Sequence, residues 1–369
     1  CHSCATPTAG TSKCPSGPSS RAVHSPKGYP VPDFWAPIGR GDSATIGERA
    51  RHLQDTGYAG VIGNQVYGPP WASMAVAAAS TTTLGLETGI AMAFVRSPFE
   101  TACAALELDQ ISNGRFTLGL GTAPQTWTED FFDEPFQPPI GRLREVIEIV
   151  RMVCEVAASG ATSIPDYNGD HYDLSFQGLH PNFGPNARQV PVWIAALRER
   201  LCELAGECAD GFIGHSIWSR WWLLERALPA ARRGAANAGR DPDDLHVQLW
   251  LTSSIDPDPL VAAQRARGNV AFYASIPSYR SYFADHGFGE MFDTLVEARR
   301  SQPLEHVIDL VPLEAARTFA VCGTSDQVGE EIERIAEHAD SLCVKPPLWG
   351  IEAADATEQA RRLEHLLLG

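Results

Sequence analysis

Four polar side chains stand where apolar runs of this sequence end. Asn64 and Gln65 follow one such run, Arg198 follows a second, and His215 follows a third. A histidine can transfer protons near neutral pH, and amide side chains can hydrogen-bond the edge of a heterocyclic ring. An arginine at a helix start suits an anion, because the first backbone N–H groups of a helix are free to bind it. These residues are therefore candidates for proton transfer, ring contacts and anion binding.

A glycine pair ends another apolar run, within the stretch ISNGRFTLGLGTAP (111–124). Gly119-Leu-Gly121 matches part of a dinucleotide-binding fingerprint, in which the glycines lie between a strand and the helix that follows it. Here the helical pattern comes before the strand, and no third glycine follows at the required spacing. We therefore expect a barrel strand fed by the turn at 112–114, with Gly121 and Thr122 at its end.

Strand-like and helix-like segments alternate from about residue 43 onward, which predicts a parallel sheet with helical crossovers. Eight such units within roughly 310 residues fit a (β/α)8 TIM barrel better than a doubly wound sheet. We expect a single barrel domain over 29–369, with insertions at about 159–189 and 257–312. The expected strands are 29–38, 58–63, 84–94, 115–121, 190–196, 210–215, 245–254 and 340–347.

The composition limits the classes of partner. The net charge of −16 disfavours nucleic acid and anionic membranes, because nothing concentrates positive charge. No apolar run reaches the roughly 18–20 residues of a membrane helix. The nine cysteines are odd in number and irregularly spaced, which favours a reducing cytoplasmic compartment over a disulfide framework.

The first 28 residues are dominated by Ser, Pro, Gly and Thr, and we expect a disordered or non-native extension there. Cys1 and Cys4, with Cys14 and His24 nearby, could be taken as metal ligands. No second Cys-x-x-Cys and no hydrophobic pattern accompany them, so we expect no metal site.

Three blocks of sequence together resemble the bacterial luciferase-like flavin and deazaflavin oxidoreductases. Residues 86–122 contain Thr-Gly, Arg-Ser-Pro, an Ala/Leu-rich helix, Ser-x-Gly-Arg-Phe and Leu-Gly-Leu-Gly in the order of that family. Residues 167–215 and 319–335 contain further family elements, also in order. The block 167–215 and the motif Arg142-Leu-Arg-Glu look most like the branch that uses coenzyme F420, an 8-hydroxy-5-deazaflavin.

The resemblance implies an F420-dependent oxidoreductase that transfers a hydride between C5 of the deazaflavin and a small organic substrate. It also implies a homodimer. One alternative is an FMN-dependent monooxygenase that uses O2 and takes reduced flavin from a separate reductase. A second is a non-catalytic barrel that serves in assembly, because Asn64-Gln65 replaces the Asp-His pair of many deazaflavin enzymes.

The resemblance also implies where the cofactor would lie. Its ring would rest over the end of the strand at 85–91, where the family commonly has a non-prolyl cis peptide, here at Gly89-Ile90 or its neighbour. The alternative is that Gly89 is an ordinary strand-end glycine. The phosphate would bind where 194–200 turns into a helix, with Arg200 either assisting or solvated. The expected cofactor-binding residues are Asn64, Gln65, Gly89, Ile90, Ala91, Gly121, Thr122, Ala196, Leu197, Arg198 and Gly214.

His215 is the best-placed candidate for proton transfer, since it follows a strand, although a structural or phosphate-binding role is also open. Asn64 is the second catalytic candidate. His180, Glu129 and Asp130 are further candidates on loops. The segment 125–139 is expected to be a lid, a pocket wall or a dimer contact, and the adjacent Trp221 and Trp222 are expected to pack against the barrel.

Overall fold

The computed structural model describes residues 32–65, 68–136, 138–184 and 187–369. Residues Pro32–Gly369 form one compact unit. The expectations for residues 1–28, including the alternative metal ligands at Cys1 and Cys4, lie outside the described residues.

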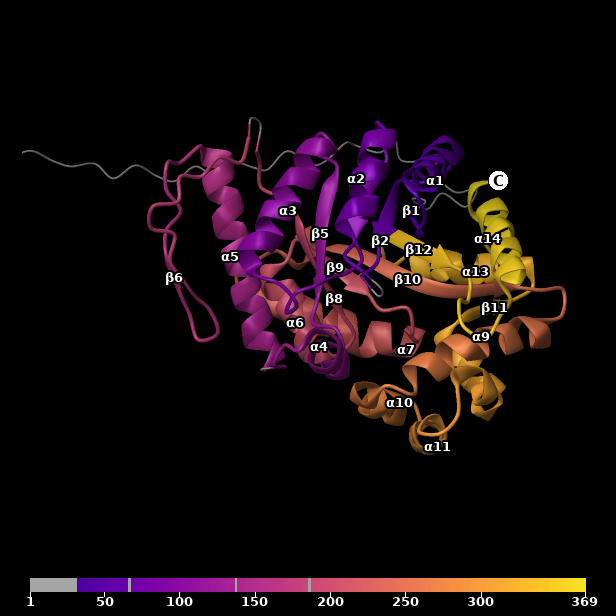
Figure 1. Ribbon diagram of the computed structural model, residues 1–369. Helices are drawn as coiled ribbons and strands as arrows, with labels where there is room; N and C mark the ends of the chain where they lie inside the picture. Colours follow the sequence, from indigo (N-terminus) through magenta and orange to yellow (C-terminus); the bar gives the residue numbers. More distant parts are fainter. Residues whose placement is uncertain (1–31, 66–67, 137, 185–186) are drawn as a thin grey trace, which may run out of the picture. The chain divides into compact units, whose positions relative to one another are not determined.

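Eight parallel strands close into a barrel, with helices around it (Figure 1). Each strand pairs with the next barrel strand along the chain, and the last, β12, pairs with the first, β1. The predicted (β/α)8 TIM barrel and its eight predicted strands are confirmed. In ring order these are β1 (Asp33–Pro37), β2 (Gly60–Gly63), β3 (Gly85–Thr88), β5 (Phe116–Gly121), β8 (Val192–Ala196), β9 (Gly211–Gly214), β10 (His246–Ile255) and β12 (Ser341–Lys345).

Helices with local start and stop signals connect the strands. Oδ1 of Asp42 accepts a hydrogen bond from the N–H of Thr45 at 2.8 Å, and the helix that begins there ends at Gly57 with φ 98°. Asp42 caps this helix because its carboxylate reaches the N–H three residues on. The outer helices are α1 (Ser43–Thr56), α2 (Trp71–Ser80), α3 (Pro98–Ile111), α5 (Pro139–Ser159), α6 (Glu199–Cys208), α8 (Leu228–Asn237), α13 (Ser325–Ala336) and α14 (Ala353–Leu368).

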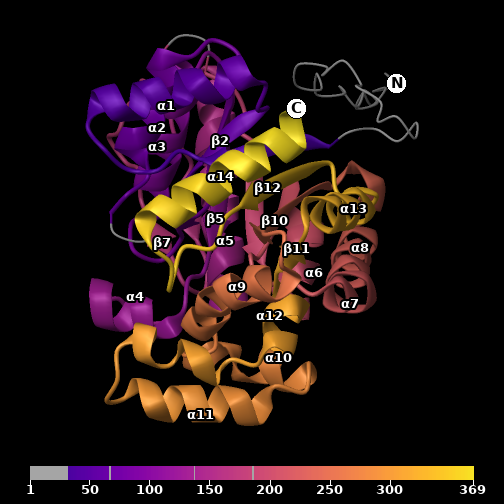
Figure 2. The same cartoon turned by 90° about the vertical axis from the view of Figure 1, so that its right-hand side faces the viewer.

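Additional segments follow β5 and β10 and gather at one end of the barrel, the end at which the strands finish (Figure 2). The expected helical insertion at 257–312 is part of this group. A short strand, β11 (Val321–Gly323), then pairs with β10 and was not predicted as a strand. The helices of the group are α4 (Gln125–Phe132), α9 (Pro259–Tyr273), α10 (Arg280–Asp285), α11 (Gly289–Arg299) and α12 (Leu313–Phe319).

The predicted insertion at 159–189 contains a two-stranded hairpin, β6 (Tyr167–Asn168) and β7 (Asp173–Leu174). The Glu145 carboxylate of α5 accepts hydrogen bonds from the backbone N–H groups of Asp170, His171 and Tyr172. The hairpin is therefore tied to the barrel by one buried carboxylate.

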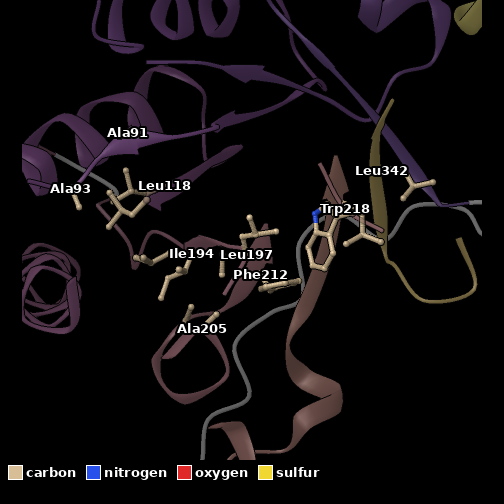
Figure 3. Close-up of a cluster of buried hydrophobic side chains, with 14 of the residues drawn as sticks. Ala91, Ala93, Leu118, Ile194, Leu197, Ala205, Phe212, Trp218 and Leu342 are labelled. Carbon is tan, nitrogen blue, oxygen red and sulfur yellow. The ribbon is translucent and has the colours of Figure 1, made fainter. Parts of the chain in front are cut away.

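The core has two parts, one between barrel and helices and one inside the barrel. Between the layers, Leu118, Ile194 and Phe212 of neighbouring strands lie near Ala205 of α6 (Figure 3). Inside, Trp35 and Trp193 pack with their ring centroids 6.4 Å apart. Side chains at Gly60, Gly85 and Gly211 would overlap these two indoles, which explains the glycines. None of the described helices combines the length and apolar character needed to span a bilayer.

Candidate active site

Two polar side chains follow β2, and they differ in their hydrogen bonds and exposure. Gln65 is buried, and its Oε1 accepts hydrogen bonds from the N–H of Met92 at 2.9 Å and from Nη1 of Arg96 at 3.0 Å. Asn64 is partly exposed, and no hydrogen bond joins its side chain to a described residue. Gln65 therefore fixes the backbone near β4 (Ala91–Met92), whereas Asn64 is free to meet a ligand.

The predicted cis peptide lies between Gly89 and Ile90, directly after β3. A Cβ at Gly89 would stand 2.3 Å from Ile62 and from Trp250, so only glycine fits against the floor of the barrel mouth. A Cβ at Gly121 would stand 2.3 Å from Cδ1 of Ile90. Gly121 therefore accommodates the Ile90 side chain, and the predicted approach of Gly121 to the cofactor ring stays a prediction.

The first turn of α6 presents an anion-binding geometry after β8. Arg198 is the cap residue, in extended conformation and with no side-chain cap hydrogen bond, so it leaves backbone N–H groups open. Its exposed guanidinium contacts Oγ of Ser281. The carbonyl of Leu197 accepts from Nε1 of Trp222 at 2.8 Å, which fixes the turn that follows Ala196.

At the end of β9, Gly214 and His215 have different surroundings. A Cβ at Gly214 would stand 2.4 Å from the indole of Trp218, so this glycine serves packing on the helix side of the strand. His215 Nε2 lies 3.1 Å from the hydroxyl of Tyr279, while its Nδ1 is buried and has no partner among the described residues. Burial and the nearby Lys345 lower the pKa of His215 to about 3. A neutral imidazole with so low a pKa is a poor proton acceptor near pH 7, which favours a hydrogen-bonding role over acid–base catalysis.

Lys345, the last residue of β12, is a component of the mouth that the sequence analysis missed. Its side chain is 4% exposed, and its Nζ lies 4.9 Å from the ring centroid of Trp250. Burial lowers the pKa of Lys345. A signal was present in the sequence, because Lys345 is one of three lysines in the chain and stands at the end of a predicted strand.

Beneath the mouth, a chain of hydrogen bonds crosses the barrel. Trp250 Nε1 donates to Oε1 of Gln248 at 2.8 Å, and Gln248 Nε2 donates to Oε2 of Glu87 at 2.8 Å. Burial raises the pKa of Glu87 to about 8. The carboxyl is therefore mostly protonated at neutral pH, and it supports the indole that forms the floor of the mouth.

Aromatic side chains from three segments line one side of the mouth. Trp349, after β12, stacks on Phe272 of α9 with centroids 3.9 Å apart, and Trp127 of α4 meets Phe272 edge-on at 6.3 Å. Tyr273 packs against both Trp349 and the imidazole of His215. Trp127 thus joins the segment 125–139 to this aromatic group, and the role of the segment as a lid, a pocket wall or a dimer contact stays a prediction. The segment after α4 is held by Arg142, whose Nη1 donates to the carbonyl of Pro135 at 2.7 Å.

Several candidates from the sequence are not drawn into the mouth. His180, Glu129, Asp130 and Arg200 are exposed, and Glu129 accepts hydrogen bonds from Gln125 of its own helix. Thr122 is partly exposed at the end of β5. The expectation for the tryptophan pair was half wrong. Trp222 is buried, but Trp221 is 44% exposed and stacks edge-on with His286, because adjacent helix positions point in different directions.

A separate cavity of about 410 Å³ lies between β10 and the helices α12 and α13. Ser216, Trp250 and Thr252 contribute to its lining, as does Trp218, whose buried Nε1 has no partner among the described residues. Further lining residues belong to α13, where Arg334 forms ion pairs with Glu330 and Glu331. This cavity lies beside the barrel rather than at its mouth. The described residues contain no cluster of three or more metal-ligating side chains.

This chain is similar to known proteins in both sequence and fold. The family model described as luciferase-like monooxygenase matches residues 30–341. An uncharacterized protein of Mycobacterium tuberculosis is 31% identical over 300 residues, covering 80% of this chain and 87% of the relative. A putative coenzyme F420-dependent oxidoreductase of the same organism is 24% identical over 302 residues, covering 76% and 84%.

Two solved structures share the fold. The coenzyme F420 dependent tetrahydromethanopterin reductase of Methanopyrus kandleri superposes with a TM-score of 0.72 at 22% identity, covering 92% of this chain and 97% of that one. The oxygenating constituent of 3,6-diketocamphane monooxygenase from Pseudomonas putida, in complex with FMN, has a TM-score of 0.62 at 17% identity, covering 91% and 98%.

Proposed function

Because the chain belongs to the luciferase-like monooxygenase family, we propose that it is an F420-dependent oxidoreductase that acts on a small organic substrate. In this proposal a hydride moves between the substrate and C5 of the deazaflavin, which is the chemistry that the cofactor supplies when bound. The observation that carries the proposal is the similarity to a putative F420-dependent oxidoreductase over 76% of this chain and 84% of the relative.

The residues at the mouth fit a cofactor with one phosphate and one planar ring system. The open first turn of α6, with the Arg198 guanidinium beside it, suits the phosphate because backbone donors and positive charge coincide there. The backbone at Gly89-Ile90 would support the ring, and Asn64 is free to hydrogen-bond its polar edge. Ala91 follows Ile90 in the chain, and Thr122 follows Gly121, which packs against Ile90.

The chain's own part in the reaction is to bind, orient and exclude water. The aromatic wall of Trp127, Phe272 and Trp349 covers one side of the mouth with apolar surface. His215 would act as a neutral hydrogen-bonding group, held by Tyr279. A water-poor mouth strengthens each polar contact that a bound molecule makes.

An FMN-dependent monooxygenase supplied by a separate reductase is the second candidate, favoured by the fold shared with an FMN complex. For both candidates, we propose that the protein is a homodimer. The third possibility, a barrel that has lost cofactor binding, is an outcome of the test below.

The test is a titration of the purified protein with F420 and with FMN, followed by quenching of the ligand's fluorescence. We expect saturable micromolar binding of F420 and weaker or no binding of FMN. Binding of FMN alone would establish the second candidate instead. If neither cofactor binds, both enzymatic proposals fail and the non-catalytic barrel is favoured.

A further inference from the structure

This chain uses lysine very sparingly. Of its 29 lysines and arginines, three are lysines, at positions 13, 27 and 345. Lys13 and Lys27 lie outside the described residues, so Lys345 is the one lysine whose surroundings the structure describes. Arginines supply the cations of the described surface, whereas this lysine is 4% exposed at the end of a barrel strand. A lysine in this position calls for an explanation, because lysines are seldom fully buried without a partner.

The amino group of Lys345 has no anionic partner. No ion pair or hydrogen bond joins Nζ to any residue in the described ranges, and its recorded contact is the face of Trp250 at 4.9 Å. A cation–π contact offsets only part of the cost of removing an ammonium group from water. The group is therefore left with unused capacity to bind an anion.

Lysine suits such a position better than arginine. Burial lowers the pKa of Lys345, whereas a guanidinium keeps its proton in any protein environment. The ammonium group of a lysine is also a compact point charge that can meet a single anionic oxygen. An anion bound at Nζ would stabilise the charged form of this buried side chain.

The position of Lys345 in the barrel separates it from the expected phosphate site. The expected phosphate donors lie in the first turn of α6, which follows β8, whereas Lys345 ends β12. In the ring of eight strands, β10 lies opposite β3, and β12 is the neighbour of β10. Lys345 in β12 and His215 after β9 therefore lie across the mouth from Gly89, the position expected to support the ring.

We propose that Lys345 is the charged contact for the substrate, whose anionic oxygen, a carboxylate in the simplest case, binds Nζ. The rest of that substrate is apolar and flat enough to pack on Trp250 and the aromatic wall. This inference rests on the proposed function, because it assumes that a small molecule reacts at this mouth. It predicts that the molecules that bind and react at the mouth are organic acids, not neutral alcohols or hydrocarbons.

The groups around Lys345 are compatible with this role. His215 on β9 is neutral, and burial raises the pKa of the Cys343 thiol to about 12, so neither carries a competing charge near pH 7. Tyr273 and Tyr279 are half-buried, and the desolvation of their hydroxyl groups raises their pKa values, so both phenols are neutral. Glu87 lies one layer deeper, hydrogen-bonded to Gln248. Lys345 is thus the cation that an anion would meet in this part of the mouth.

The probe is benzoate, an aromatic carboxylate, with benzyl alcohol as its neutral counterpart. The full chain is labelled with [ε-¹³C]lysine, so that three resonances are expected, and Lys345→Met identifies the resonance of Lys345 by its loss. We expect benzoate, but not benzyl alcohol, to shift that resonance. Benzoate affinity should fall as the pH rises through the pKa of Lys345, because only the ammonium form binds the anion.

Lys345→Met should weaken benzoate binding by more than about tenfold, because it removes a charge-assisted hydrogen bond. Arg300→Met is the matched control, since it removes one positive charge from an exposed side chain that pairs with Glu297. It should leave benzoate affinity unchanged. Lys345→Met should also fold, and its melting temperature should equal or exceed that of the wild type, because an apolar side chain replaces a buried unpaired amine.

The outcomes separate this proposal from the proposed function. Equal benzoate affinity in wild type and Lys345→Met would overturn it, as would the absence of any shift of the Lys345 resonance. Loss of F420 affinity in Lys345→Met, with benzoate binding intact, would mean that Lys345 binds the cofactor and not the substrate. If the wild type binds benzoate through Lys345 but does not bind F420, the assignment of cofactor fails while the anion site stands.

Discussion

Glu87 and Gln248 form a hydrogen bond across the interior of the barrel, with 2.8 Å between Oε2 and Nε2. Both side chains are fully buried, and they stand on β3 and β10, which lie opposite each other in the ring. Oε1 of Glu87 has no partner among the residues described. Burial raises the pKa of Glu87 to about 8, so the barrel holds a carboxyl group that is mostly neutral at pH 7.

The first prediction concerns Glu87→Gln. In the wild type, the folded-state pKa of about 8 lies above the ordinary value of 4.5, so the native state binds more protons between these values. The free energy of unfolding therefore falls as the pH rises from 5 to 8. The amide cannot ionise, so the variant should gain at least about 1 kcal/mol relative to wild type over this range. Urea unfolding at pH 5, 6, 7 and 8 measures the difference, and a constant difference would contradict the buried, protonated carboxyl.

The second prediction concerns His215→Gln. The folded-state pKa of about 3 lies below the ordinary value of 6.5, so between these values the unfolded state binds more protons. Wild-type stability should therefore rise with pH from about 4 to 6.5, by up to about 1.4 kcal/mol per pH unit. The variant should lack this contribution. His180→Gln serves as the control, because it makes the same change of residue type on an exposed side chain. Parallel slopes for wild type and His215→Gln would contradict a buried neutral imidazole.

The third prediction tests the phosphate site at the start of α6. Arg198→Glu places a negative charge beside the open N–H groups and should weaken F420 binding by about tenfold or more. Arg200→Glu makes the same change of charge two residues later, on an exposed side chain that contacts no described partner. It should have a much smaller effect. Fluorescence titration measures both affinities, and equal losses would show that the effect is general to the surface rather than local.

The fourth prediction concerns the floor of the mouth. Gly89→Ala would place a Cβ 2.3 Å from Ile62 and Trp250, so both side chains would have to move. We expect a loss of about 1–3 kcal/mol in the free energy of unfolding, and a change in Trp250 fluorescence. Gly329→Ala in α13 is the matched control, because its Cβ would meet only Cδ1 of Leu366 at 3.4 Å. That change should stabilise the helix by about 0.5–1 kcal/mol. Tolerance of alanine at position 89 would refute the close packing.

The eight strands were predictable because their signals are local. Apolar runs alternate with helical segments that begin and end at capping residues, such as Asp42 before α1 and Gly57 after it. Residues at strand ends were predictable for the same reason, since barrel topology places those ends together. The strand at 84–94 was predicted as one segment, but the structure divides it into β3 and β4 around Gly89-Ile90.

The amino-acid sequence by itself therefore determined the barrel, its order of elements and the strand ends that form the mouth. It did not determine which polar side chains meet inside. Glu87 and Gln248 are 161 residues apart, and His215 and Tyr279 are 64 apart, so no local pattern links them. The contact of Glu87 with Gln248 depends on the register in which the eight strands close, because a slip of one residue would turn each side chain to the other face. The contact of His215 with Tyr279 depends on how the short helix Pro277–Tyr279 packs at the end of β9. Likewise, only the tertiary structure placed Nζ of Lys345 over the ring of Trp250, with no anionic partner among the described residues.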